Sequence, residues 1–139
     1  MTLFVGDADR SVRFYRDGLG FAVLMDREYE ADWPALFGVA SSRVRAVAMG
    51  DTDRPELGQI ELVTFAEPVP AGPPATAPAT GTAMLAFHID LEAVLPRLRD
   101  QGATSVRRIT LARGNAIVTV RDPDGVMVEL IDVGRPAAS

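Results

Sequence analysis

A chain of 139 residues that is 47% hydrophobic is long enough for one domain with a buried core and too apolar for a disordered chain. Its net charge of -5, without a basic tract, argues against nucleic acid as a partner, and the absence of Cys excludes disulfides, thiolate metal sites and a Cys nucleophile. The first residues do not resemble a signal peptide, and the uncharged stretch 68–89 is interrupted by prolines. We therefore expect a cytoplasmic protein with no membrane span.

The first half of the chain predicts a strand, a helix, a strand, a short helical turn and two more strands. Asp7 or Asp9 can cap the helix, whose apolar residues fall on one face. The helical turn carries two aromatic side chains, and the strands after it alternate or are mostly apolar. The predicted ranges are 3–5, 10–19, 21–29, 32–38, 43–49 and 59–65.

Residues 67–82 hold half of the chain's prolines, which is typical of a linker, and the pattern of elements restarts after them. Pro96 counts against the helix of the second half, because a proline inside a helix costs about 3 kcal/mol. An apolar stripe of Leu91, Leu95 and Leu98 nevertheless favours that helix, with Asp90 as its cap. The predicted strands are 83–89, 106–111, 115–121 and 126–133, and the predicted helix is 91–101.

The two halves of the chain can be overlaid on each other. Asp7 matches Asp90, and the strand segment around Glu61 matches the one around Glu129, with the same order of elements between them. Each half is therefore predicted to be a βαβββ module. The sequence predicts an α+β protein of one domain over 1–139, with module 1 at 1–66, the linker at 67–82 and module 2 at 83–134.

Each module has one carboxylate in the middle of an otherwise apolar strand, Glu61 in the first and Glu129 in the second. Burying an unpaired carboxylate is costly, so each must meet water, a counter-charge, a metal or a substrate. A dense turn sequence, Asp122-Pro123-Asp124-Gly125, leads into the strand of Glu129. On strand periodicity alone, a solvated glutamate and a functional one are equally good interpretations.

Taken together, these motifs resemble the vicinal oxygen chelate superfamily, which includes glyoxalase I, bleomycin-resistance proteins and extradiol dioxygenases. The resemblance covers nearly the whole chain and implies two βαβββ modules that form a cup-shaped mixed β-sheet around a small ligand. It is carried by Asp7-x-Asp9-Arg10-Ser11-Val12-x-Phe14-Tyr15, Leu19-Gly20-Phe21, Phe37-Gly38, Ile60-Glu61-Leu62, Asp122-Pro123-Asp124-Gly125 and Val128-Glu129-Leu130.

The resemblance also implies a metal site, with His or Gln on the first strand, Glu on the fourth, His on the fifth and Glu on the eighth. Glu61 and Glu129 match the two carboxylates, but Met84 stands at the fifth-strand position, and the first-strand position falls at or just before Met1. A thioether is a poor ligand for such metals. We expect no cofactor, and at most a divalent ion held weakly by the two glutamates. His88, the only histidine, lies on the face of Met84 but further along the strand.

The first functional hypothesis is an isomerase, epimerase, lyase or cyclase that transfers a proton on an oxygenated metabolite without a metal. In a cup lined by Phe65, Met84 and Ile131, one of Glu129 and Glu61 would act as base and the other as acid, with Glu129 favoured as base. His88 or Arg45 would orient the substrate.

The second hypothesis is a metal-free protein that sequesters a drug-like ligand, and the third is a metal-dependent glyoxalase or dioxygenase. For the second, Trp33 and Tyr29 would contact the ligand, whereas Phe37 is more simply explained as core packing. In every case the expected partner is a small molecule, and we predict a homodimer, because relatives of this kind cover their strand edges by pairing.

Overall fold

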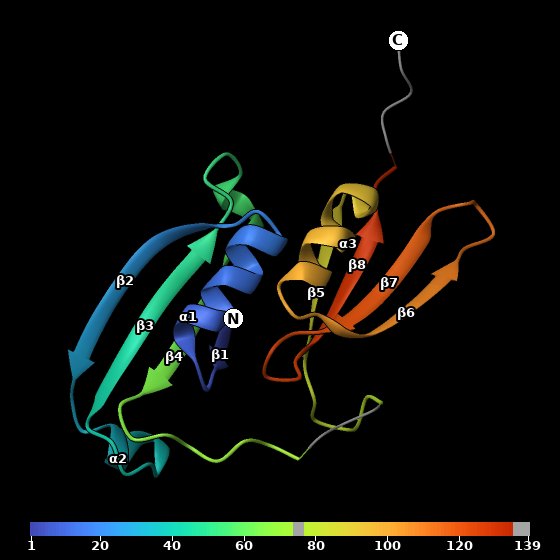
Figure 1. Ribbon diagram of the computed structural model, residues 1–139. Helices are drawn as coiled ribbons and strands as arrows, with labels where there is room; N and C mark the ends of the chain where they lie inside the picture. The colour runs from blue at the N-terminus through green and yellow to red at the C-terminus, as the bar shows by residue number, and fades with distance from the viewer. Residues whose placement is uncertain (74–76, 135–139) are drawn as a thin grey trace. The chain divides into compact units, whose positions relative to one another are not determined.

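A computed structural model of the protein describes residues 1–73 and 77–134 (Figure 1). The chain divides into two compact units, unit 1 at Met1–Gly72 and unit 2 at Pro73–Ser139. The division falls inside the proline-rich segment, whose described residues form no helix or strand. Each unit has its own four-stranded sheet, so each is described by itself.

Unit 1 follows the predicted order of strand, helix and three strands, with a short helix between the second and third strands. Its long helix begins at Ala8 because Asp7 is the cap: the Asp7 carboxylate accepts a hydrogen bond of 3.0 Å from the Arg10 backbone N–H. The elements are β1 (Thr2–Phe4), α1 (Ala8–Arg13), a π-helical continuation (Phe14–Gly18), β2 (Ala22–Glu30), α2 (Trp33–Phe37), β3 (Arg43–Gly50), a 3-10 turn (Pro55–Leu57) and β4 (Gln59–Phe65).

Unit 2 repeats this order without the extra helix. Asp90 caps its helix as predicted, accepting a hydrogen bond from the backbone N–H of Ala93 at 3.2 Å. Pro96 lies inside that helix with its side chain exposed, while the leucine stripe is buried, so the prediction of a helix there is confirmed. The elements are β5 (Met84–Ile89), α3 (Leu91–Asp100), β6 (Thr104–Thr110), β7 (Ala116–Arg121) and β8 (Met127–Asp132).

The two sheets have the same topology, β1-β4-β3-β2 in unit 1 and β5-β8-β7-β6 in unit 2. The first strand of each unit runs parallel to its neighbour, and the other pairs are antiparallel. The carboxylate in the apolar strand of each unit lies opposite the unit's first strand, with Thr2 beside Glu61 and Ala86 beside Glu129. The α+β prediction of two βαβββ modules is confirmed.

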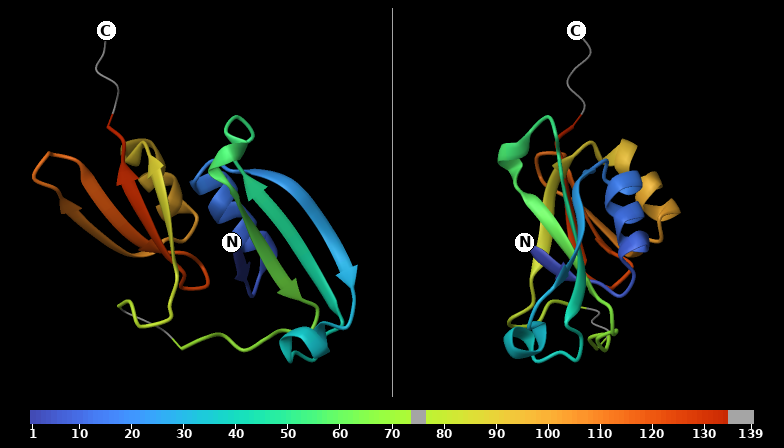
Figure 2. Two further views of the ribbon diagram at one scale, coloured as in Figure 1. Left: turned by 180° about the vertical axis from the view of Figure 1, so that it is seen from behind. Right: turned by 90° about the vertical axis from the view of Figure 1, so that its left-hand side faces the viewer.

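Each sheet buries one face against its own helix and leaves the other face more open (Figures 1 and 2). In unit 1, α1 contacts β3 and β4, and Val47 and Leu62 beneath it are fully buried. In unit 2, α3 contacts β8, where Val128 and Leu130 are fully buried. Glu129 lies on the opposite face of β8, as the alternation of its neighbours predicts.

The turn before β8 behaves as its sequence predicts. The Asp122 carboxylate accepts hydrogen bonds from the backbone N–H groups of Asp124 and Val126, at 2.9 and 2.8 Å, and Asp122 itself is buried. Gly125 has φ of +87°, a conformation that favours glycine. The turn fixes where β8 begins, and therefore which face of the sheet Glu129 occupies. Among the described helices, none combines the length and apolar character that a membrane crossing requires.

Candidate functional site

A cavity of about 330 Å³ opens on the face of the first sheet that α1 does not cover. Its base is aliphatic, formed by Val44, Ala46 and Val63 of the two central strands. Among the described residues that line it, the polar side chains are those of Tyr29, Trp33, Thr2 and Glu61. Cavities that bind small molecules are usually about 300–1,000 Å³, so this one suits a small ligand.

Aromatic rings make up one wall of this cavity. The Phe37 ring stacks on Trp33 with 6.0 Å between ring centroids, and it meets Phe4 edge-to-face at 5.6 Å. Phe4 in turn stacks on the buried ring of Phe65 at 5.7 Å. Because each exposed ring rests on a more buried one, the wall is held in place before any ligand arrives. We call Phe4, Trp33, Phe37 and Phe65 the aromatic wall.

The short helix α2 supplies half of the aromatic wall. Asp32 caps the helix by accepting a hydrogen bond from the Ala35 N–H, and Gly38 ends it with φ of +67°. Trp33 and Phe37 are four residues apart and so lie on one face of the helix. Phe37 is 47% exposed and lines the cavity, so the prediction that it serves as core packing is wrong.

Glu61 is the one acidic side chain among the described residues that line the cavity. Its Oε1 accepts a hydrogen bond of 3.1 Å from the Thr2 hydroxyl, which the parallel pairing of β1 and β4 brings alongside. Among the described residues, no basic side chain pairs with this carboxylate. One oxygen of Glu61 is therefore oriented by Thr2, and the other is left for a ligand.

Trp33 and Tyr29 line the same cavity, as the sequence suggested. The Tyr29 hydroxyl donates a hydrogen bond to the sulfur of Met25 at 3.5 Å, and sulfur is a weak acceptor. The indole N–H of Trp33 is buried and has no hydrogen-bond partner among the described atoms. The cavity thus combines an apolar surface with one carboxylate and one weakly held hydroxyl donor.

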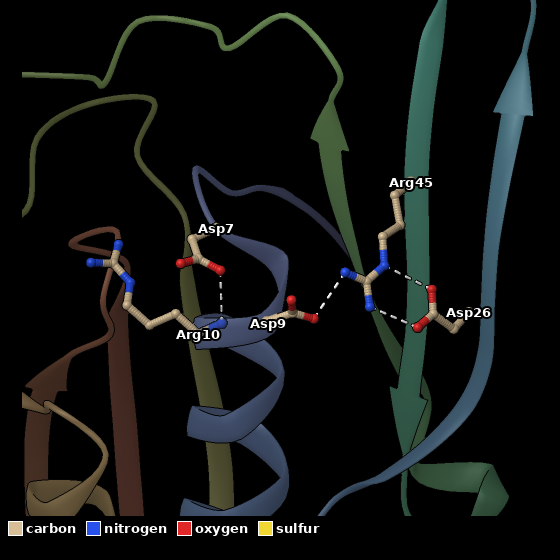
Figure 3. A network of polar contacts seen from close by, with 5 residues as sticks. All are labelled: Asp7, Asp9, Arg10, Asp26 and Arg45. Carbon is tan, nitrogen blue, oxygen red and sulfur yellow. Dashed lines mark hydrogen bonds and ion pairs between the residues drawn. The ribbon is translucent and has the colours of Figure 1, made fainter.

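Arg45 lies away from this cavity, on the face of the sheet that α1 covers (Figure 3). Its guanidinium pairs with both oxygens of Asp26 at 2.9 and 2.8 Å, and with Asp9 at the start of α1 at 2.9 Å. The hydrogen bonds from Arg45 lower the pKa of Asp26, and the same contacts raise the pKa of Arg45. Arg45 joins helix to sheet, and the structure does not bring it together with Glu61.

A second cavity, of about 360 Å³, lies beside this ion-pair network. It is lined by the β1–α1 turn, by Arg43 and Arg45, and by Glu28, and the charged groups largely pair with one another. The backbone N–H of Arg10 binds the Asp7 carboxylate there and lowers the pKa of that group. With its charges already paired, this cavity is a weaker candidate than the one lined by the aromatic wall.

The other predicted residues gather on the open face of the second sheet. Glu129 is half-buried on β8, with Ile131 two residues along the same face. Met84 and His88 are exposed on the neighbouring strand β5. Neither Glu129 nor His88 forms a hydrogen bond or ion pair with a described residue, and neither cavity described above includes them. The structure groups Glu129, His88, Met84 and Ile131 on one face, but it does not enclose them.

The donors within each unit do not make up the metal-ligand set that the resemblance implies. In unit 1 the partner of Glu61 on the first strand is the hydroxyl of Thr2, a weaker ligand than imidazole. In unit 2 the strand beside Glu129 presents Met84 and Ala86 before His88. Within residues 1–73 and 77–134, no three His, Asp or Glu side chains lie together as a metal site would require.

Of the residues predicted for a site, Glu61, Trp33 and Tyr29 line this cavity, and Thr2 and Phe4 line it without having been predicted. Phe65 is next to the cavity but buried, where it supports Phe4. A signal for Thr2 and Phe4 was present, because both alternate with the buried Leu3 on a strand that lies parallel to that of Glu61. The alternation alone does not show which strand lies beside β1. Only the pairing of β1 with β4 shows that Thr2 and Phe4 lie near Glu61.

Comparison with known proteins agrees with this fold. A model of the Glyoxalase/Bleomycin resistance protein/Dioxygenase superfamily matches residues 1–130. A lactoylglutathione lyase-like protein of Aspergillus terreus, terB, is 34% identical over 138 residues, which cover 91% of this chain and 68% of that protein.

Two solved structures are similar in fold. A glyoxalase family protein from Bacillus cereus has a TM-score of 0.78 and 22% identity, over 95% of this chain and 90% of that one. Glyoxalase I from Zea mays has a TM-score of 0.66 and 21% identity, over 94% of this chain and 42% of its own length. At these identities the similarity concerns the fold alone.

Proposed function

The chain belongs to the Glyoxalase/Bleomycin resistance protein/Dioxygenase superfamily, and from that premise we propose that it is a small-molecule enzyme of the isomerase or lyase type. It moves a proton on an oxygenated metabolite and needs no tightly bound metal. The observation that carries this proposal is the Glu61 carboxylate, oriented by Thr2 on the wall of an otherwise apolar cavity. Fold alone would not support it, because one fold serves many reactions.

In the proposed reaction, Glu61 is the general base. Its second oxygen takes a proton from the carbon next to a carbonyl group, and the electron pair of that C–H bond moves onto the carbonyl oxygen. The Tyr29 hydroxyl exchanges its weak bond to Met25 for one to that oxygen. In an α-hydroxyketone, the protonated Glu61 then returns the proton to the former carbonyl carbon. The hydroxyl group on the other carbon passes its proton to the former carbonyl oxygen and becomes the new carbonyl, so atoms and charge balance. The largely apolar lining makes the surroundings of Glu61 less polar than bulk water, which strengthens both interactions.

The sequence favoured Glu129 as base, and the geometry supports Glu61 instead. Glu61 shares a cavity with aromatic and aliphatic side chains, whereas Glu129 lies on the open face of the second sheet and lines neither described cavity. No step of the proposal uses a metal, because the donors within each unit do not fit one. At most, a divalent ion is held weakly by a glutamate.

Hydrogen–deuterium exchange tests the proposal. Protein dialysed against EDTA is incubated in D₂O with 2-hydroxyacetophenone or dihydroxyacetone, and loss of the α-proton signal is followed by NMR. We expect exchange with at least one of them, reduced about 10²- to 10⁴-fold in Glu61→Gln. Glu30→Gln is the matched control, since Glu30 is an exposed carboxylate of the same unit outside the cavity. Exchange that disappears on dialysis and returns with added metal would contradict the metal-free proposal.

A second candidate function is sequestration of an aromatic ligand, which the aromatic wall favours on its own. Wall and cavity would suffice for binding, and Glu61 would then only accept a hydrogen bond. Binding in the cavity, with no exchange for any α-hydroxyketone tried, would favour this function over the enzyme.

We also propose that the protein acts as a homodimer. In unit 1, β2 is an edge strand, and no described strand of that sheet pairs with its outer side. Its Val23 and Leu24 are exposed, and such an edge is commonly covered by another chain. Light scattering should give twice the chain mass at micromolar concentration, and a monomer there would rule the dimer out.

A further inference from the structure

We infer that the molecule bound in the cavity of unit 1 is a planar aromatic compound that carries a hydroxyl group and no negative charge. This inference rests on the proposed function and names the substrate class for the same site. Three observations support it, namely the aromatic wall, the charge of the lining and the size of the cavity.

The aromatic wall leaves two rings open to a ligand. Phe4 is 50% exposed and Phe37 is 47% exposed, although both belong to stacked ring pairs. Because Phe4 and Phe37 are in contact, they form one exposed apolar surface, and such surfaces often mark binding sites. A flat ring can stack against them, as aromatic groups prefer, and the wall needs no rearrangement to receive it. A saturated ring of the same size would lose that contact.

The charge of the lining selects against anions. Glu61 is the only charged side chain among the described residues that line the cavity. In an apolar cavity a second negative charge is repelled more strongly than in water, and no described lining residue offsets it. Carboxylates, phosphates and glutathione conjugates, which carry carboxylates, are therefore disfavoured. A hydroxyl group is favoured, because the Glu61 carboxylate can accept a hydrogen bond from it in addition to the one from Thr2.

The size of the cavity limits the ligand further. A volume of about 330 Å³ is near the lower end of the usual range for small-molecule sites, about 300–1,000 Å³. One ring or two fused rings suit this space better than a peptide conjugate.

Three probes of matched size test the effects of planarity and of negative charge separately. 2-Naphthol is planar and uncharged at neutral pH, 2-naphthoate is planar and anionic, and decahydro-2-naphthol keeps the hydroxyl but is not planar. Isothermal titration calorimetry should show 2-naphthol binding at least about tenfold more tightly than either of the others. Equal binding of 2-naphthol and 2-naphthoate would overturn the inference, and so would no detectable binding of 2-naphthol.

Variants show whether the binding uses this cavity. Glu61→Gln should weaken 2-naphthol about tenfold and reduce its advantage over 2-naphthoate, because the carboxylate becomes a neutral amide. Phe37→Leu should reduce the advantage over decahydro-2-naphthol, since it keeps an apolar side chain and removes the ring. Leu36→Ala and Glu30→Gln are controls, being exposed neighbours of cavity residues that do not line it. If neither test variant differs from its control, the ligand binds elsewhere and the inference is wrong.

The inferred substrate class and the proposed reaction can be refuted independently of each other. If dihydroxyacetone exchanges its proton in a Glu61-dependent way while 2-naphthol does not bind, the reaction stands and the aromatic class is refuted. If 2-naphthol binds as described but no hydroxyketone exchanges a proton, the class stands and sequestration replaces catalysis.

Discussion

Units 1 and 2 share one architecture but differ on their open faces. Both have the same strand order, a helix capped by aspartate and a glutamate opposite the first strand. Unit 1 adds α2 between its second and third strands, and with it Trp33 and Phe37. Unit 2 joins its corresponding strands, β6 and β7, by a short turn.

The residues that hold each sheet together are therefore not the residues that form the candidate site. Buried leucines at matching positions, Leu62 and Leu130, hold both sheets against their helices. The aromatic wall, in contrast, depends on a short inserted helix and on Phe4 of an exposed strand. We conclude that the surroundings of Glu61 differ from those of Glu129 because of the inserted helix α2, since the repeated βαβββ elements are the same in both units.

The largest expected effect tests that distinction between the two glutamates. Glu61→Gln should lower proton exchange about 10²- to 10⁴-fold, because the base is lost. Glu129→Gln should lower it less than about tenfold, because that residue lines neither described cavity. The exchange rate of each variant, measured with the same hydroxyketone, decides the matter. A larger loss in Glu129→Gln would restore the role that the sequence assigned to it.

The next effect tests whether the scaffolds are equivalent. Leu62→Ala and Leu130→Ala each remove a fully buried side chain from the central pair of strands. Each should lower the free energy of unfolding by about 2–5 kcal/mol, since a cavity remains. Urea denaturation followed by circular dichroism measures both. If one variant loses less than about 1 kcal/mol of unfolding free energy, the two cores do not contribute equally to stability, and the scaffolds of the two units are not equivalent.

Helix capping gives a smaller test of the same symmetry. Asp7 and Asp90 each accept a backbone hydrogen bond three residues on, at 3.0 and 3.2 Å. Replacing either by Ala should cost about 1 kcal/mol, while Asn, which also caps well, should cost little. Thermal unfolding of the four variants would show this. Equal losses for Ala and Asn at one site would mean that charge, and not capping, matters there.

Much of this fold could be predicted from the sequence because local rules agree with it. Asp7 and Asp90 begin helices, Gly125 permits its turn, and the alternation around Glu129 selects its face. The proline in α3 broke a local rule, but the buried leucine stripe outweighed it.

The site was harder to predict, because its residues meet only through strand pairing. In the sequence, Arg45 lies on a strand with alternating polar and apolar residues. That pattern does not show which face of the sheet the Arg45 side chain occupies. Its neighbours decide, since Arg45 pairs with Thr64 of β4 on the face where α1 brings Asp9 close. The sequence predicts Phe37 as a core residue, because aromatic side chains are usually buried. In the structure, α2 has only five residues, none of them buried, and Phe37 is 47% exposed.

The smallest effect compares the exposed ion pairs of the two units, which join β2 and α1 to β3 through Arg45 in unit 1 and α3 to β6 in unit 2. In unit 1, Arg45 lies 2.9 Å from Asp9 and 2.8 Å from Asp26 (Figure 3), whereas in unit 2 the pair of Arg108 and Glu92 is longer, at 3.7 Å. All of these groups are partly exposed, so Asp26→Asn should cost only about 0.2–1 kcal/mol at pH 7, and Glu92→Gln less.

The pair of Arg45 and Asp26 also predicts a pH dependence. Arg45 lowers the pKa of Asp26 in the folded protein, so the pair stabilises the fold above the ordinary carboxyl value of 3.8, and that contribution is lost as the pH falls below this value. Urea denaturation at pH 7 and pH 3 should therefore show a stability difference between wild type and Asp26→Asn that shrinks on acidification. A difference that stays constant or grows toward pH 3 would mean that Asp26 stabilises the fold through packing and not through its charge.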